Sequence, residues 1–160
     1  MIDLIKKHIA DYSASNWTEW KASLAPDVIY EEVPMRVRVK GPDEWLKTVQ
    51  RWKKAFPDLD GSVLSAVESE DGSEVAAEIE WKGTHSGPLD GPMGTIPATN
   101  KRGSMKAMMM FKVRNNKIVE AKHYFDLLTM LAQIGVAPMA GMPTAQAGAA
   151  GTAQAAPRRP

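Results

Sequence analysis

The sequence predicts an α+β domain in which the helices are segregated from a run of antiparallel hairpins. Apolar residues recur at helical spacing through most of the first 56 residues, whereas residues 61–126 are rich in strand-forming segments broken by turn signals. Helices and strands do not alternate regularly along the chain, as they would in a parallel sheet. A curved antiparallel sheet wrapped around one long helix forms a cone with an apolar pocket at its mouth.

Three helices are predicted in the N-terminal part of the chain. The first has an apolar stripe that consists of Ile2, Ile5, Ile9 and Tyr12. The second follows Asn16, which makes a capping arrangement with Glu19 three residues later, and we expect it to end at Pro26. The third opens at residues 41–44 and closes at Pro57, and its apolar stripe consists of Trp45, Val49, Trp52 and Phe56.

The remaining regular structure is predicted to be mostly strand. Residues 28–33 are rich in β-forming side chains, Pro34 breaks the run, and residues 36–40 resume it as a hairpin-like return. The four long strands that we expect to form the main sheet are residues 61–70, 74–85, 104–114 and 117–126.

Turn signals connect these strands. Asp71-Gly72 joins the first long pair as a tight hairpin, and Asn115-Asn116 marks the turn of the second pair. A loop rich in glycine and proline, residues 87–100, lies between the two pairs. A short last helix at residues 127–134 stops at Gly135, which is a plausible C-cap.

Composition excludes several classes of protein. A length of 160 residues suits one domain, and 44% hydrophobic residues allow that domain a real core. A net charge of +1, with the basic residues scattered, gives no electrostatic reason to expect a nucleic acid or an acidic membrane surface as a partner. The absence of cysteine excludes a disulfide scaffold, a thiolate metal site and a cysteine nucleophile.

The N-terminal residues predict a cytoplasmic protein, and the C-terminal residues predict a disordered tail. The first turn contains Asp3 and no apolar stretch of the kind found in signal peptides, and no run of about 18 apolar residues predicts a membrane span. Residues 138–160 are mostly alanine, glycine and proline, with no periodic large apolar residue to bury. We therefore expect one domain at residues 1–137 and a disordered tail at 138–160.

Several segments carry a resemblance to a known family. They are DVIYEEVP at 27–34, AFPDL at 55–59, WKGTHSGPL at 81–89, PATNK at 97–101, KIVE at 117–120 and YFDLLTMLAQIG at 124–135. In their order and spacing the chain resembles the SnoaL-like polyketide (ester) cyclase family of the nuclear transport factor 2-like superfamily. The family commonly has glycine where this chain has Asn100, but asparagine tolerates a positive φ, so we expect the turn to survive.

The resemblance implies a fold and a chemistry. The fold is the nuclear transport factor 2-like cone, a curved antiparallel sheet wrapped around N-terminal helices with an apolar pocket. The chemistry is an intramolecular aldol condensation that closes a ring on a polyketide ester, without a metal ion or an organic cofactor. Asp126 matches the aspartate that such cyclases use as acid/base, and His85 matches a second polar group of the pocket. The partner would be a hydrophobic small molecule, and a homodimer through the outer sheet face is common for this architecture.

The residues themselves allow a structural alternative for both catalytic candidates. His85 continues the apolar face of the strand at 74–85, so it could equally be a hydrogen-bonded core histidine. Asp126 immediately precedes the last helix, where it would be a good N-cap with a low pKa. Catalysis needs the opposite, a carboxylate in an apolar pocket with a raised pKa.

Candidates for substrate binding are aromatic or flexible apolar side chains on the predicted pocket elements. They are Tyr30, Trp45, Trp81, Met109 and Tyr124, each of which could instead belong to the core. Simple alternation places Tyr124 on the same face as Asp126, but also on that of the charged residues Glu120 and Lys122. The strand therefore carries a bulge, or its first half lies outside the pocket rim. We expect His8 on a helix surface, and His123 on the strand face opposite Asp126.

Two other function classes stay open. The same cone could bind a hydrophobic small molecule without catalysis, which a capping, solvated Asp126 would favour. An isomerase or an epoxide hydrolase could also use the fold, and Arg36 or Arg38 could contribute to epoxide opening, although no second acid is convincingly placed. Three histidines without acidic residues at ligand spacing do not predict a metal site.

Overall fold

The strands form one six-stranded sheet and one small two-stranded sheet, seen in a computed structural model that describes residues 1–91 and 94–136. The predicted tail at 138–160 lies outside the described residues. The helices are α1 (Ile2–Ser13), α2 (Trp17–Ala22), α3 (Pro42–Ala55) and α4 (Leu127–Gln133). The strands are β1 (Leu24–Glu32), β2 (Val37–Lys40), β3 (Asp60–Glu68), β4 (Glu74–Thr84), β5 (Leu89–Gly91), β6 (Gly94–Ile96), β7 (Arg102–Arg114) and β8 (Lys117–Phe125).

The main sheet has the order β2-β1-β8-β7-β4-β3 and is mixed rather than purely antiparallel. Neighbouring strands pair antiparallel except for β1 and β8, which run parallel. The prediction of an antiparallel sheet was wrong at this one pair. The reason is that β1 and β8 are not joined by a hairpin, so no tight turn dictates their relative direction.

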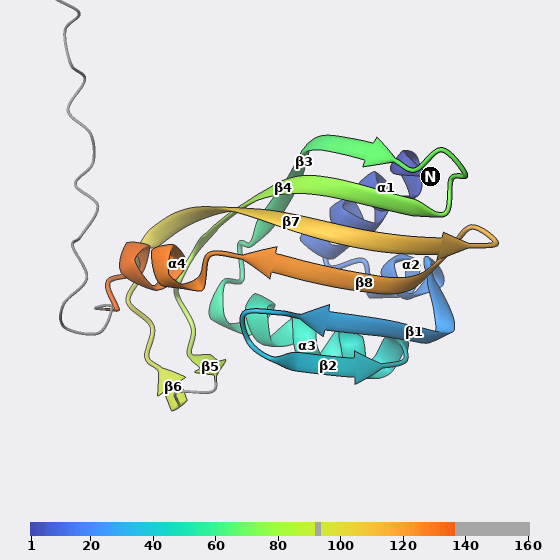
Figure 1. Cartoon of the computed structure of the whole chain (residues 1–160). Coiled ribbons are helices and arrows are strands. Elements are labelled where there is room, and N and C mark those ends of the chain that lie inside the picture. The colour runs from blue at the N-terminus through green and yellow to red at the C-terminus, as the bar shows by residue number, and fades with distance from the viewer. Residues whose placement is uncertain (92–93, 137–160) are drawn as a thin grey trace, which may run out of the picture.

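The helices α1, α2 and α3 lie on one side of this curved sheet, and α4 lies at one end of it (Figure 1). The apolar stripe predicted for the third helix is confirmed, because Trp45, Val49, Trp52 and Phe56 are all buried. The inward face predicted for β4 is confirmed in the same way, from Val75 through Trp81 to His85. The α+β cone with its concave face on the helices is therefore the architecture of the protein.

The connections differ from the prediction in two places. Helix α2 stops at Ala22, and Pro26 belongs to β1 instead of ending the helix. Proline is tolerated there because it lies in the irregular stretch between Leu24 and Ile29, where the pairing with β8 changes register. The loop predicted at residues 87–100 contains the small β5–β6 hairpin, which projects beyond the main sheet (Figure 1).

The predicted asparagine turns are confirmed by their backbone angles. Asn115 and Asn116 have φ values of 53° and 56°, as the tight turn between β7 and β8 requires. Asn100 has a φ of 56°, so asparagine supports the left-handed turn that glycine commonly makes in the family. In the described part of the chain, no helix combines the length and the apolar character needed to cross a membrane.

A β-bulge in β8 decides which of its side chains face the helices. Lys112 of β7 lies opposite Glu120, but the next residue, Val113, lies opposite Ile118, so Val119 is the extra residue. Beyond the bulge the odd-numbered residues, including Ala121 and His123, point toward the interior.

Candidate active site

A cavity of about 80 Å³ lies between the helices and the concave face of the sheet. Its lining is dominated by aromatic side chains, namely Tyr12, Trp20, Tyr30, Trp45, Trp52, Phe56, Trp81 and Phe125. Polar side chains are few and include His8 of α1 and His123 of β8. An apolar, aromatic cavity with a small number of polar groups is typical of a site for an uncharged small molecule.

Four of the five predicted substrate-binding residues lie in this cavity. Tyr30, Trp45, Trp81 and Met109 all line it, and all are buried. Tyr124 does not line it, because the bulge in β8 places this side chain on the outer face, where it is 42% exposed. Tyr124 lies opposite Met108 of β7, which is also exposed on that outer face.

Asp126 takes the structural role that the sequence left open. It is the exposed N-cap of α4, where Oδ1 accepts from the Thr129 amide at 3.0 Å and Oδ2 from the Thr129 hydroxyl at 2.5 Å. The Thr129 hydrogen bonds lower the pKa of the Asp126 carboxyl from its ordinary value. A solvated carboxylate with a lowered pKa is a weak base, and it is not among the residues that line the cavity.

His85 is buried beside Phe56, whose ring centre is 5.1 Å away, but it is not a lining residue of the cavity. Its Nδ1 lies 3.1 Å from the Thr99 hydroxyl, and its backbone carbonyl accepts from the amides of Thr99 and Asn100. Burial lowers the pKa of the imidazole. These contacts fix the loop before β7, and they do not bring His85 to Asp126.

We expect Asp126→Ala to destabilise the protein by about 1 kcal/mol, the usual effect of removing an N-cap side chain. Asp126→Asn should stay close to wild type, because asparagine caps nearly as well. The lowered carboxyl pKa means that the cap stabilises above the ordinary value of 3.8 and that this contribution is lost as the pH falls further. Urea denaturation at neutral pH measures both variants, and equal losses for alanine and asparagine would contradict the capping role.

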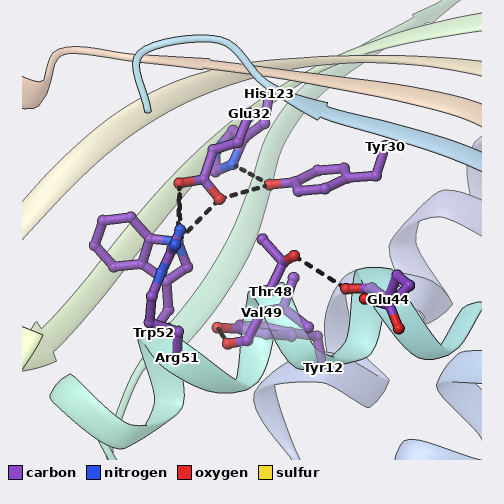
Figure 2. A network of polar contacts seen from close by, with 9 residues as sticks. All are labelled: Tyr12, Tyr30, Glu32, Glu44, Thr48, Val49, Arg51, Trp52 and His123. Atoms are coloured by element: carbon purple, nitrogen blue, oxygen red, sulfur yellow. Dashed lines mark hydrogen bonds and ion pairs between the residues drawn. The ribbon is translucent and has the colours of Figure 1, made fainter. Parts of the chain in front are cut away.

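The sequence analysis did not identify Glu32, which is the most deeply buried carboxylate of the described residues. Its side chain is 0% exposed and accepts from Trp52 Nε1 at 3.2 and 3.0 Å and from Arg51 Nη2 at 3.2 Å (Figure 2). The Tyr30 hydroxyl donates to Glu32 Oε2, also at 3.2 Å. Burial raises the pKa of the Glu32 carboxyl, and the hydrogen bonds together with the Arg51 charge oppose that rise.

The network continues from Glu32 to the cavity wall through Tyr30. His123 Nδ1 lies 3.2 Å from the Tyr30 hydroxyl oxygen (Figure 2). Since that hydroxyl donates to Glu32, its oxygen is free to accept, which assigns the ring proton of His123 to Nδ1. Nε2 is then the basic nitrogen, and it is buried without a hydrogen-bond partner among the described residues. Burial lowers the pKa of His123 to about 4, so the imidazole is neutral at pH 7.

Two further cavity-lining groups have polar atoms without partners. The indole N–H groups of Trp45 and Trp81 are buried, and neither donates a hydrogen bond to any described residue. The Trp81 ring centre is 6.2 Å from that of His123, and the Trp45 ring stacks on Tyr30 at 4.6 Å. Three residues of the cavity lining therefore carry polar atoms without partners, a basic nitrogen on His123 and an N–H donor on each of Trp45 and Trp81. These are the groups that a molecule with both an acidic hydrogen and carbonyl oxygens needs.

The expectation that His8 lies on a helix surface was wrong. Its side chain is 2% exposed and lines the cavity, because Trp20 of α2 and Trp45 of α3 pack against its ring. The His8 ring stacks on Trp20 with centres 4.9 Å apart. Its spacing of three residues from Ile5 is the signal that could have placed it on the buried stripe.

Comparisons with known proteins agree with this architecture. The crystal structure of a protein from Jannaschia sp. CCS1, assigned as a SnoaL-like polyketide cyclase, has a TM-score of 0.74 at 16% identity, over 86% of this chain and 92% of that chain. IdmH from Streptomyces antibioticus, assigned as a polyketide cyclase, is 27% identical with a TM-score of 0.70, over 84% of this chain and 97% of that one.

A third similar structure has been assigned a different activity. AclR from Streptomyces galilaeus, assigned as a hydroxylase, is 24% identical with a TM-score of 0.71, over 85% of this chain and 81% of that chain. No curated protein matches the sequence. The family model described as SnoaL-like polyketide cyclase matches residues 3–134. With this match over most of its length, and with the nuclear transport factor 2-like cone confirmed, the chain belongs to the SnoaL-like polyketide cyclase family.

Proposed function

We propose that the protein is a cofactor-independent, polyketide cyclase-like enzyme that closes a ring by an aldol-type reaction, with His123 as its acid/base. The observation that carries the proposal is the unpartnered Nε2 of His123, a residue that lines the mainly apolar cavity. The other ring nitrogen of His123 is held by the Tyr30 hydroxyl, which is held in turn by Glu32. A base oriented by a second group, itself oriented by a third, is the usual arrangement of an activated acid/base.

The reaction uses one proton and needs no redox partner. His123 Nε2 removes a proton from a carbon beside a carbonyl group, and an indole N–H from Trp81 or Trp45 stabilises the enolate oxygen. The enolate carbon attacks a second carbonyl carbon of the same molecule and forms the new carbon–carbon bond. The alkoxide that results takes the proton back from His123. While the imidazole is charged, its Nδ1–H donates to the Tyr30 hydroxyl, which links that charge to the Glu32 carboxylate.

The low basicity of His123 narrows the choice of substrate. A nitrogen with a pKa of about 4 is neutral and available at pH 7, but it removes only a weakly held proton effectively. A carbon between two carbonyl groups carries such a proton. We therefore propose a 1,3-dicarbonyl compound or its ester as the substrate, bound against Tyr30, Trp45, Trp81 and Met109.

Exchange of deuterium into ethyl 2-methylacetoacetate, followed by NMR in D₂O, tests the proposal without knowledge of the natural substrate. We expect His123→Gln to slow enzyme-dependent exchange by a factor of about 100 or more, the usual contribution of a general base. Asp126→Asn is the matched control and should exchange at the wild-type rate. If His123→Gln retains the rate, the base is another group, and if Asp126→Asn loses it, the role returns to Asp126.

A non-catalytic binder of a hydrophobic small molecule is the second candidate. It is favoured by Asp126, since the carboxylate that the resemblance assigned as acid/base is a solvated helix cap. The wild-type protein separates the two functions: a binder would take up apolar probes in the cavity without accelerating exchange. The expected homodimer and the cytoplasmic location remain predictions.

A further inference from the structure

We propose that His8 forms a second hydrogen-bonding subsite at the far side of the same cavity, which accepts a hydrogen bond from a hydroxyl group of the bound molecule. The inference rests on the proposed function in taking this cavity as the substrate site. It does not depend on His123 being the base. The inference predicts that the substrate carries a hydroxyl group away from its reacting carbons.

His8 lies among aromatic rings where the cavity meets α1 and α2. Its ring centre is 4.9 Å from that of Trp20, 5.3 Å from that of Trp45 and 6.2 Å from that of Phe111. The side chain is 2% exposed, and it lines the cavity together with Trp20 and Trp45. A flat molecule in the cavity would therefore lie against His8 and the aromatic rings beside it.

The hydrogen bonds of Ser23 assign the proton on the His8 ring. The Ser23 hydroxyl donates to the Trp20 carbonyl oxygen at 2.6 Å, so its own oxygen is left to accept. His8 Nδ1 lies 2.7 Å from that oxygen and must be the donor. The Nε2 atom of His8 is then the acceptor of the ring, and the one hydrogen bond that the His8 side chain makes among the described residues is through Nδ1. Burial also lowers the pKa of His8 to about 3, which keeps the ring neutral.

His8 thus repeats the arrangement of His123 on the other wall of the cavity. In each case Nδ1–H donates to a hydroxyl that donates onward, to the Trp20 carbonyl or to Glu32, and Nε2 is left as an acceptor. Trp45 connects the two, because it contacts His8 and stacks on Tyr30. Two neutral acceptors joined by an aromatic wall suit an uncharged, flat molecule with a donor group at each end.

The charge of the lining supports an uncharged molecule. Among the described residues that line the cavity there is no lysine, arginine, aspartate or glutamate, so a carboxylate or phosphate would be desolvated without a counter-charge. A hydroxyl group meets no such penalty, provided that it finds an acceptor. His8 Nε2 supplies that acceptor, since Nδ1 carries the ring proton.

Phenol and toluene form a matched pair of probes for this subsite, because they differ in the hydroxyl group. In protein labelled with ¹⁵N at histidine, we expect phenol to shift the Nε2 signal of His8 and toluene to leave it in place. His8→Phe keeps the stacking on Trp20 and removes the acceptor. We expect this variant to bind phenol about five times more weakly, the effect of one neutral hydrogen bond, and toluene as well as wild type does.

His123→Phe is the control, since phenol could reach His123 instead. The proposal predicts that this variant keeps the preference for phenol over toluene. The proposal is overturned if His123→Phe loses the preference for phenol over toluene, or if His8→Phe keeps it. If His8→Phe does not fold, Ser23→Ala serves in its place, because removing the acceptor of Nδ1–H lets the proton move to Nε2 and should also weaken phenol binding. Deuterium exchange by wild type is unaffected by these outcomes, so failure here is distinct from failure of the proposed function.

Discussion

Glu32→Ala is expected to lower the free energy of unfolding by about 3–5 kcal/mol, the usual effect of removing one partner of a buried ion pair, because the Glu32 carboxylate is fully buried and Arg51 is only 23% exposed. The substitution leaves the indole N–H of Trp52 and the guanidinium of Arg51 without their acceptor. It also leaves the Tyr30 hydroxyl with only His123 as partner. A buried donor without an acceptor bears the full cost of its desolvation, so the loss exceeds that of one ordinary hydrogen bond.

Urea denaturation at pH 7 measures this loss, and the neighbouring residue provides a matched control. Glu31 pairs with Arg38 at 3.6 Å near the surface, where its side chain is 32% exposed. Glu31→Ala should therefore cost less than about 1 kcal/mol. Glu32→Gln keeps the size and one acceptor oxygen, and should fall between the two alanine variants. If Glu32→Ala and Glu31→Ala destabilise equally, the network does not hold the fold together.

The second large effect is expected on acidification. The pKa values of His8 and His123 are lowered by burial from 6.5 to about 3 and about 4, so the native state binds fewer protons than the unfolded chain below pH 6.5. Their contribution to stability is complete above pH 6.5 and is lost as the pH falls toward the native values. Between pH 8 and pH 5 each histidine accounts for about 2 kcal/mol, which makes a loss of about 4 kcal/mol in total.

A variant isolates the histidine contribution from other titrating groups. Glu32 acts with the opposite sign, because burial raises its pKa and protonation relieves the buried charge. His8→Phe retains Glu32 and His123, so their contributions cancel when the pH dependence of its unfolding free energy is subtracted from that of the wild type. We expect the wild-type protein to lose about 2 kcal/mol more than His8→Phe between pH 8 and pH 5 in urea titrations. Parallel pH profiles would show that His8 is not buried in its neutral form.

Most of the fold could be predicted because it is encoded by local patterns. The stripe of α3, the alternation of β4 and the asparagine turn at 115–116 each depend on residues close in sequence, and each is confirmed. The parallel pairing of β1 with β8 could not be predicted in this way. It joins segments some 90 residues apart, and no turn connects them to fix their direction.

The site was predicted only in part, because the prediction took Asp126 to face the pocket. Simple alternation from Asp126 then places Tyr124 there as well, whereas both side chains are exposed and His123 lines the cavity. Counted from the buried Ile118, it is the extra residue Val119 that turns His123 inward. Bulges leave no strong mark in a single sequence. Glu32 did carry a signal, since it shares a strand face with Tyr30. Its partners Arg51 and Trp52 come from α3, so only the assembled fold shows that the carboxylate is buried and paired.

The cavity of about 80 Å³ is small, since sites for drug-sized molecules usually measure about 300–1,000 Å³. Helix α4 contributes Gln133 to the lining, and Gln133 Oε1 accepts from the Ser104 amide at 2.8 Å. The other end of α4 is fastened by Asp126 and Thr129. A drug-sized molecule can therefore enter only if the cavity widens, and the hydrogen bonds at the two ends of α4 oppose that widening.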